Sequence, residues 1–188
     1  MDKGMKPLTD FLLGLGIEEV PHTGKTYLGH LIGVYRLMEA GGCDAEVCRA
    51  GMFHSIYGTQ QFQGFKLPLE RRPEVRRLIG ERAERLAYLN CALDRASLDR
   101  ATFDRAVERG EEPFHYRDRI TGETFDLPRA EFDDLCRVHL YDWLEQVPRS
   151  HLGWDYRRPG YRGMAEWLGG AARESYDRVF AGERAGAG

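Results

Sequence analysis

Apolar residues recur at helical spacing through most of this chain, and glycine or proline separates the successive runs. The first run ends near Gly16, and a longer run over residues 27–42 ends on two glycines, as helices commonly do. Asp44 is placed to cap a third helix, which closes at His54. A loop over residues 55–68 follows. The pattern therefore predicts a succession of short helices in the first third of the chain.

The helical pattern resumes after this loop. Pro73 suits the first turn of the next helix, and Gly80 interrupts the pattern before it continues. Helices are predicted again over residues 128–147 and about 161–180. The tail over residues 181–188 is rich in glycine and alanine, so we expect it to fray.

Two segments depart from helical spacing. Residues 114–117 and 124–127 flank a turn that contains Gly122, and they predict a small β-hairpin over about residues 113–127. The stretch over residues 93–106 repeats every five residues, a period that fits neither a long straight helix nor a strand face. This repeat predicts a charged surface segment.

Together these elements predict an all-α, mostly helical fold with a small β-hairpin insertion. A chain of 188 residues can bury one substantial core, and it leaves little room for a second domain. We therefore expect a single domain over residues 1–188, with its core over about residues 23–147.

Composition narrows the range of partners. The net charge of -3 comes from interspersed charges without a basic stripe, which argues against nucleic acid as a partner. No apolar run is long enough to cross a membrane, so no membrane partner is expected. The four cysteines show no CxxC spacing and predict reduced, mostly buried thiols in a cytoplasmic protein. Core or interface roles suit Trp143, Trp154 and Trp167, and an interface role would allow a homodimer.

Three apolar, helix-like segments each carry a residue that commonly binds metal ions. His30 and His54 offer imidazoles, and Asp142 offers a carboxylate. This set suits divalent Mn, Fe or Zn and leaves coordination positions open for chemistry. A histidine on an apolar face is more often a hydrogen-bonded core residue, so the competing interpretation is structural. His139 lies three residues before Asp142 on the same helix face and is a candidate fourth or supporting ligand.

The same segments resemble the HD superfamily, most closely the RelA/SpoT-type alarmone hydrolases. Residues 24–34 (GKTYLGHLIGV) resemble that family's first histidine segment, and residues 50–59 (AGMFHSIYGT) resemble its His-Asp segment. Residues 78–86 resemble a later helix start, and residues 140–146 resemble the closing segment with its aspartate. The resemblance covers about residues 23–147.

By this resemblance, His30, His54 and Asp142 would bind a divalent ion, with Mn or Fe the first candidates. Ser55 stands where the family has aspartate, so the ion would lose one negative ligand. The Glu-Asp pair that assists water attack in alarmone hydrolases has no acidic counterpart near Tyr57. Alarmone hydrolysis itself is therefore not predicted.

Further residues are candidates for the chemistry around the ion. The catalytic candidates are Ser55, Tyr57, Glu81 and Glu84, and the substrate-binding candidates are His22, Lys25 and Arg76. Tyr57 is expected to donate a hydrogen bond to a substrate oxygen. Glu81 and Glu84 either reach the site or lie on the helix surface, with Glu84 solvated and Glu81 paired with an arginine. Arg76 belongs to a basic cluster that either attracts a phosphate or forms charged helix surface.

These residues support three functional hypotheses. The first is a divalent-metal enzyme that hydrolyses a phosphate-containing or otherwise polar small molecule. The second is an iron-dependent oxygenase built on two histidines and one carboxylate. The third is a degenerate HD domain that holds no metal and binds a ligand or a partner.

Overall fold

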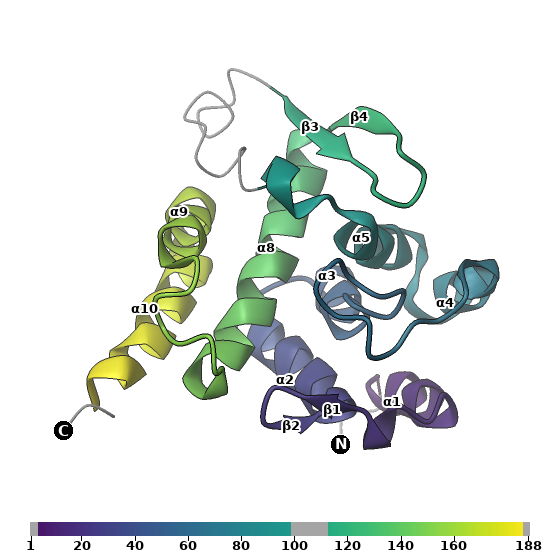
Figure 1. Cartoon of the computed structure of the whole chain (residues 1–188), viewed down its shortest axis with the longest axis horizontal. Coiled ribbons are helices and arrows are strands. Elements are labelled where there is room, and N and C mark those ends of the chain that lie inside the picture. The colour runs from purple at the N-terminus through teal and green to yellow at the C-terminus, as the bar shows by residue number, and fades with distance from the viewer. Residues whose placement is uncertain (1–3, 99–112, 186–188) are drawn as a thin grey trace. The chain divides into compact units, whose positions relative to one another are not determined.

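The computed structural model of the chain describes residues 4–98 and 113–185 (Figure 1). These residues are mostly helical, and they include two small two-stranded sheets. The predicted fold class, all-α with a small β-hairpin, is confirmed. The chain divides into two compact units, Met1–Cys91 and Ala92–Gly188. The single domain over residues 1–188 stays a prediction.

The first unit is built from short helices in close succession along the chain (Figure 1). In order, its elements are α1 (Lys6–Gly14), η1 (Ile17–Glu19), β1 (Pro21–His22), β2 (Lys25–Thr26), α2 (Tyr27–Ala40), α3 (Ala45–Met52), η2 (Leu69–Arg71), α4 (Arg72–Ile79) and α5 (Glu81–Ala92). The small hairpin of β1 and β2 was not predicted. It leads directly into α2, where the Thr26 hydroxyl accepts a hydrogen bond from the Gly29 amide at 3.1 Å and caps the helix.

Helix α2 packs along α3, and a glycine allows the close contact. A Cβ atom at Gly51 of α3 would lie 2.1 Å from the Met38 sulfur of α2, so a larger residue would force that side chain aside. Helix α3 ends at Met52, not at His54 as predicted, and His54 lies in the turn that follows. This packing therefore sets the distance between α2 and the turn that carries His54.

The predicted cap of α3 is confirmed. Oδ1 of Asp44 accepts hydrogen bonds from the amides of Glu46 at 2.9 Å and Val47 at 3.0 Å. Burial opposes ionisation of this carboxyl, but the Val47 amide, Arg82 and the Glu46 amide outweigh it and lower the pKa of Asp44. The ionised carboxylate therefore stabilises the first turn of α3.

Replacing this cap is expected to destabilise the first unit. We expect Asp44→Ala to lower the free energy of unfolding by about 1 kcal/mol at neutral pH, because two amides lose their acceptor. The folded-state pKa is below the unfolded value, so the contribution is present above the unfolded pKa and is lost as the pH falls through the folded pKa. Urea unfolding at neutral and acidic pH measures both effects.

Asp10→Ala is the matched control for this measurement. Asp10 forms an exposed i,i+4 pair with Lys6, and such surface pairs contribute little, typically less than about 1 kcal/mol. An equal loss of stability in both variants would contradict the capping role of Asp44.

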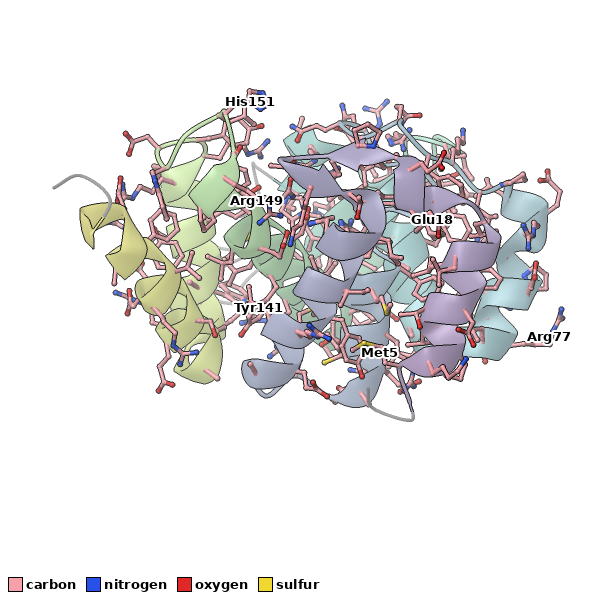
Figure 2. All side chains as sticks on the ribbon, turned by 90° about the horizontal axis from the view of Figure 1, so that it is seen from below. Met5, Glu18, Arg77, Tyr141, Arg149 and His151 are labelled. Carbon is pink, nitrogen blue, oxygen red and sulfur yellow. The ribbon has the colours of Figure 1, made fainter. Side chains whose placement is uncertain are left out.

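The described part of the second unit contains the predicted hairpin and the helices α8, α9 and α10 (Figure 1). Its elements are β3 (Phe114–Arg117), β4 (Thr124–Leu127), α8 (Arg129–Gln146), η3 (Val147–Arg149), α9 (Arg158–Leu168) and α10 (Gly170–Ala185). The strands pair antiparallel with Phe114 opposite Leu127, and Gly122 has a φ of 80° in their turn. Figure 2 shows Tyr141 of α8 among the interior side chains, and its hydroxyl donates to Ser175 of α10 at 3.2 Å.

The predicted single helix over residues 161–180 is wrong, because two helices cover this region. Gly169 and Gly170 have φ values of 62° and 44°, and this left-handed backbone ends α9 before α10 begins. The predicted frayed tail over 181–188 is also wrong as far as Ala185, which still belongs to α10. Residues 186–188 lie outside the described part of the chain.

The five-residue repeat begins inside the second unit. Leu93 and Leu98 are buried, and Leu93 forms a β-bridge with Asp118, so this beginning is not purely surface as predicted. Residues 99–112, which hold most of the repeat, lie outside the described residues.

The composition also led to expectations about the cysteines, the tryptophans and membrane-spanning segments. The four cysteines are free thiols, and Cys48, Cys91 and Cys136 are buried. Trp143 is buried, and its ring stacks on Tyr161 at an interplanar angle of 14°. Within residues 4–98 and 113–185, no helix has the length and hydropathy needed to span a membrane. The homodimer stays a prediction.

Candidate metal centre

His30 lies on the buried face of α2. Tyr27, Leu31, Val34 and Met38 are the buried neighbours at helical spacing along this face. The imidazole itself is fully buried. Burying a polar ring in this way is unfavourable unless its nitrogens have partners, so the surroundings of His30 are informative.

His54 is held in a defined protonation pattern. Its Nδ1 lies 2.8 Å from the carbonyl oxygen of Gly51, and its side chain is buried. A carbonyl oxygen only accepts hydrogen bonds, so Nδ1 carries the hydrogen. In the neutral ring, Nε2 of His54 then carries the lone pair, the tautomer that metal-binding histidines commonly show when the other ring nitrogen donates a hydrogen bond.

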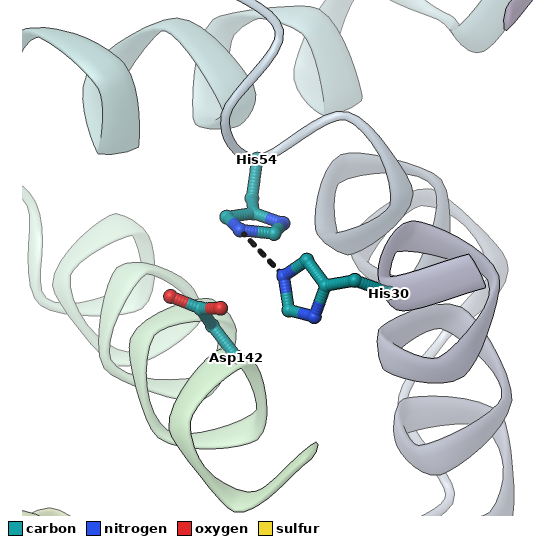
Figure 3. A group of neighbouring side chains, drawn as sticks. All are labelled: His30, His54 and Asp142. Atoms are coloured by element: carbon teal, nitrogen blue, oxygen red, sulfur yellow. Dashed lines mark hydrogen bonds between the residues drawn. The ribbon is translucent and has the colours of Figure 1, made fainter. Parts of the chain in front are cut away.

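The two imidazoles face each other within the first unit. Nε2 of His30 lies 3.5 Å from Nε2 of His54, and the ring planes are 84° apart (Figure 3). Two nitrogen ligands of a tetrahedral ion at about 2.0–2.1 Å would be about 3.3–3.4 Å apart. The observed separation is close to that value. An N–H···N hydrogen bond from His30 to His54 fits the same distance, and this is the structural interpretation of the pair.

Ser55 is buried beside His54. Its hydroxyl lies 2.9 Å from the hydroxyl of Tyr27, one turn before His30 on α2. This buried contact joins the two histidine segments without adding a negative charge. Tyr27 was not among the predicted site residues, although it lies within residues 24–34, the segment that carries His30.

The surroundings of Glu84 differ from the prediction. The prediction that Glu84 is a solvated helix residue is wrong, because its side chain is fully buried. Arg72 contacts both carboxylate oxygens, at 2.6 and 3.2 Å, and Arg76 adds a contact at 3.3 Å. Tyr57 is also buried and donates its hydroxyl hydrogen to Glu84 at 3.0 Å. Two arginines and one hydroxyl therefore compensate the buried carboxylate.

The tyrosine in this network stays protonated. Burial raises the pKa of Tyr57 far above its ordinary value, and the negative charge of Glu84 raises it further. The hydroxyl is therefore a hydrogen-bond donor at neutral pH. In this structure it donates to Glu84, whereas the sequence predicted donation to a substrate oxygen.

The other predicted residues are distributed over the first unit. His22 of β1 is half-buried, and its ring centroid lies 4.3 Å from that of His30. Lys25 of β2 and Glu81 at the start of α5 are exposed. Arg76 is partly exposed and contacts Glu84. Of the predicted substrate-binding residues, His22 is thus the one that the structure places against a histidine of the pair.

Asp142 belongs to the second unit, on α8. It is partly buried, and its Oδ1 accepts a hydrogen bond from Gln146 at 2.6 Å. Burial raises the pKa of Tyr161 to about 12, and the charge of Asp142 adds to this effect. His139, on the same helix, is buried and stacks on Tyr161.

One residue that contacts a histidine of the pair was missed. Asn90 of α5 is buried, and its Nδ2 donates to the carbonyl oxygen of His54 at 2.8 Å. Asn90 lies between Leu89 and Cys91 in an apolar part of α5. A buried amide there needs a partner, and this was the available signal in the sequence.

Fold and site together define a mostly helical protein with a buried imidazole pair between a helix and the turn after the next helix. The family model of a domain of unknown function (DUF6817) matches residues 11–95. Both histidines lie inside the matched stretch, and Asp142 lies outside it. No curated protein and no solved structure matches the chain.

Proposed function

We propose that this protein is a divalent-metal-dependent enzyme that hydrolyses a phosphate-containing or otherwise polar small molecule. The observation that carries the proposal is the pair of Nε2 atoms of His30 and His54, 3.5 Å apart in a buried setting. The hydrogen on Nδ1 of His54 leaves the lone pair of Nε2 directed at His30.

Asp142 is proposed as the third ligand. Each of the three residues offers one ligand atom, a ring nitrogen or a carboxylate oxygen. The order of the segments along the chain resembles HD proteins, and this order supports the assignment. Two neutral imidazoles and one carboxylate carry a single negative charge, so a divalent ion would leave a net positive centre. Such a centre favours an anionic substrate.

A bound divalent ion would polarise a phosphoryl or carbonyl oxygen and make a water molecule more acidic. The residues around the pair have separate tasks. The carbonyl of Gly51 keeps the hydrogen of His54 on Nδ1. The contact between Tyr27 and Ser55 ties the two histidine segments together. The half-buried ring of His22, next to His30, is placed to contact a substrate that approaches from its exposed side.

Metal titration of the full-length protein tests the proposal. We expect metal-stripped protein to bind one Zn, Mn or Fe ion per chain, and Asp142→Asn to lower the affinity by more than about tenfold because a charged ligand is lost. Asp133→Asn is the matched control on α8, since Asp133 pairs with Arg129 and Trp167 and should leave affinity unchanged. Wild-type protein that binds no ion would refute the proposal.

The identity of the reaction follows from a second measurement. A hydrolase is expected to release phosphate or another polar product from test substrates without consuming oxygen. Oxygen consumption that depends on iron would instead support the oxygenase, which uses the same residue types. A protein that binds ligands without metal would support the degenerate HD domain.

A further inference from the structure

Helix α5 contacts the turn that carries His54 at two separate places. At one, Nδ2 of Asn90 and the thiol of Cys91 both reach the carbonyl oxygen of His54, at 2.8 and 3.1 Å. At the other, Glu84 accepts the hydroxyl hydrogen of Tyr57, three residues after His54. The turn is therefore held by α5 on both sides of Ser55.

The contact with Asn90 acts on the orientation of the imidazole. It holds the main-chain carbonyl of His54, while the carbonyl of Gly51 holds Nδ1 of the ring. With the main chain and one ring nitrogen both restrained, the direction of Nε2 is restrained as well. All of these groups are buried, so water does not compete for them.

Glu84, the acceptor for Tyr57, is itself held in place by Arg72. Glu84 is gripped by the bidentate guanidinium of Arg72, which in turn lies over the ring of Tyr88 at 3.7 Å. Because Arg72 binds both of its oxygens, the Glu84 carboxylate has a fixed position for the hydroxyl of Tyr57. Tyr57, and with it the chain segment after His54, is therefore fixed against α5.

We propose that Asn90 and Glu84 are positioning residues of the metal site, acting on His54 through its main chain and through Tyr57. This inference rests on the proposed function and assigns α5 the task of holding one ligand in place. Neither residue touches the ion. Both would set how closely Nε2 of His54 keeps the geometry that an ion requires.

The test compares zinc affinity in full-length variants. Asn90→Leu keeps the approximate size of the side chain and removes the donor; Oδ1 of Asn90 has no hydrogen-bond partner among the described residues, so no second bond is lost there. Tyr57→Phe removes a single oxygen atom and leaves the contact between Arg72 and Glu84 in place. We expect each variant to bind zinc about tenfold more weakly, the range typical of residues that orient a ligand.

Glu74→Gln is the matched control. It weakens the exposed ion pair between Arg71 and Glu74 and should leave the zinc affinity unchanged. A second readout separates positioning from a loss of stability. The ring nitrogens of His54 in the metal-free protein, followed by ¹⁵N NMR and assigned with His54→Ala, are expected to shift in Asn90→Leu and not in Glu74→Gln.

The outcomes are distinguishable. If wild-type protein binds zinc and both variants bind it within twofold, the positioning role is overturned and the proposed function stands. If wild-type protein binds none of Zn, Mn and Fe, the proposed function fails, and unchanged His54 ring signals would also overturn the positioning role. Should Asn90→Leu fail to fold, Tyr57→Phe still decides, since it removes one atom from the network.

Discussion

His54→Ala is expected to lower zinc affinity by more than about 100-fold, beyond the range for residues that only orient a ligand. The variant removes one of the two nitrogen donors whose Nε2 atoms lie 3.5 Å apart. His30 alone cannot replace it, because an ion with one protein nitrogen would have to recruit other ligands at that side. Isothermal titration with zinc measures the loss, and circular dichroism checks that the helices remain.

His151→Ala is the matched control for this experiment. His151 is exposed and lies at the edge of the molecule in Figure 2, so its removal changes the histidine count without touching the pair. Equal zinc affinity in the two variants would show that the buried pair is a hydrogen-bonded core feature. That result would refute the proposed function.

Arg72→Ala is expected to produce the largest loss of stability, about 3 kcal/mol or more. Glu84 is fully buried, and Arg72 supplies contacts to both of its oxygens. Without Arg72, the weaker contact from Arg76 at 3.3 Å and the hydroxyl of Tyr57 would remain to balance a buried charge. Urea unfolding followed by circular dichroism measures the change in the free energy of unfolding.

Two further variants separate the loss of the buried network from the loss of any surface arginine. Arg71 is the residue next to Arg72 and pairs with Glu74 at the surface, so Arg71→Ala should lower the free energy of unfolding far less than Arg72→Ala. The double variant Arg72→Ala, Glu84→Gln should recover part of the lost stability, because it removes the charge that Arg72 balances. A loss for Arg72→Ala as small as that for Arg71→Ala would contradict the importance of the buried network.

Local signals in the sequence account for much of the secondary structure. The cap at Asp44, the break at Gly80 and the turn at Gly122 were each predicted, and each is present. These features depend on residues a few positions apart, through amides that need an acceptor or backbone that favours glycine. The break at Gly169 and Gly170 was missed because the apolar pattern continues across it.

The chemistry of the site was predictable only in part. Apolar spacing around His30 and His54 marked both as buried polar residues, and the structure brings their rings together. The spacing could not show which groups contact each histidine. The Gly51 contact to Nδ1 of His54 comes from a main-chain carbonyl, which any residue supplies, and the amide of Asn90 lies 36 positions away in the chain. Asp142 as a third ligand stays a proposal.

By itself, the sequence determined the helical class, most helix limits, the hairpin and the histidines worth examining, because periodicity and capping act over short distances along the chain. Only the tertiary structure decided that Glu84 is buried between Arg72 and Tyr57, and that the hydroxyls of Tyr27 and Ser55 meet. These contacts join residues 12 to 28 positions apart. Which side of a helix becomes buried depends on the elements that pack against it, and local sequence does not specify those neighbours.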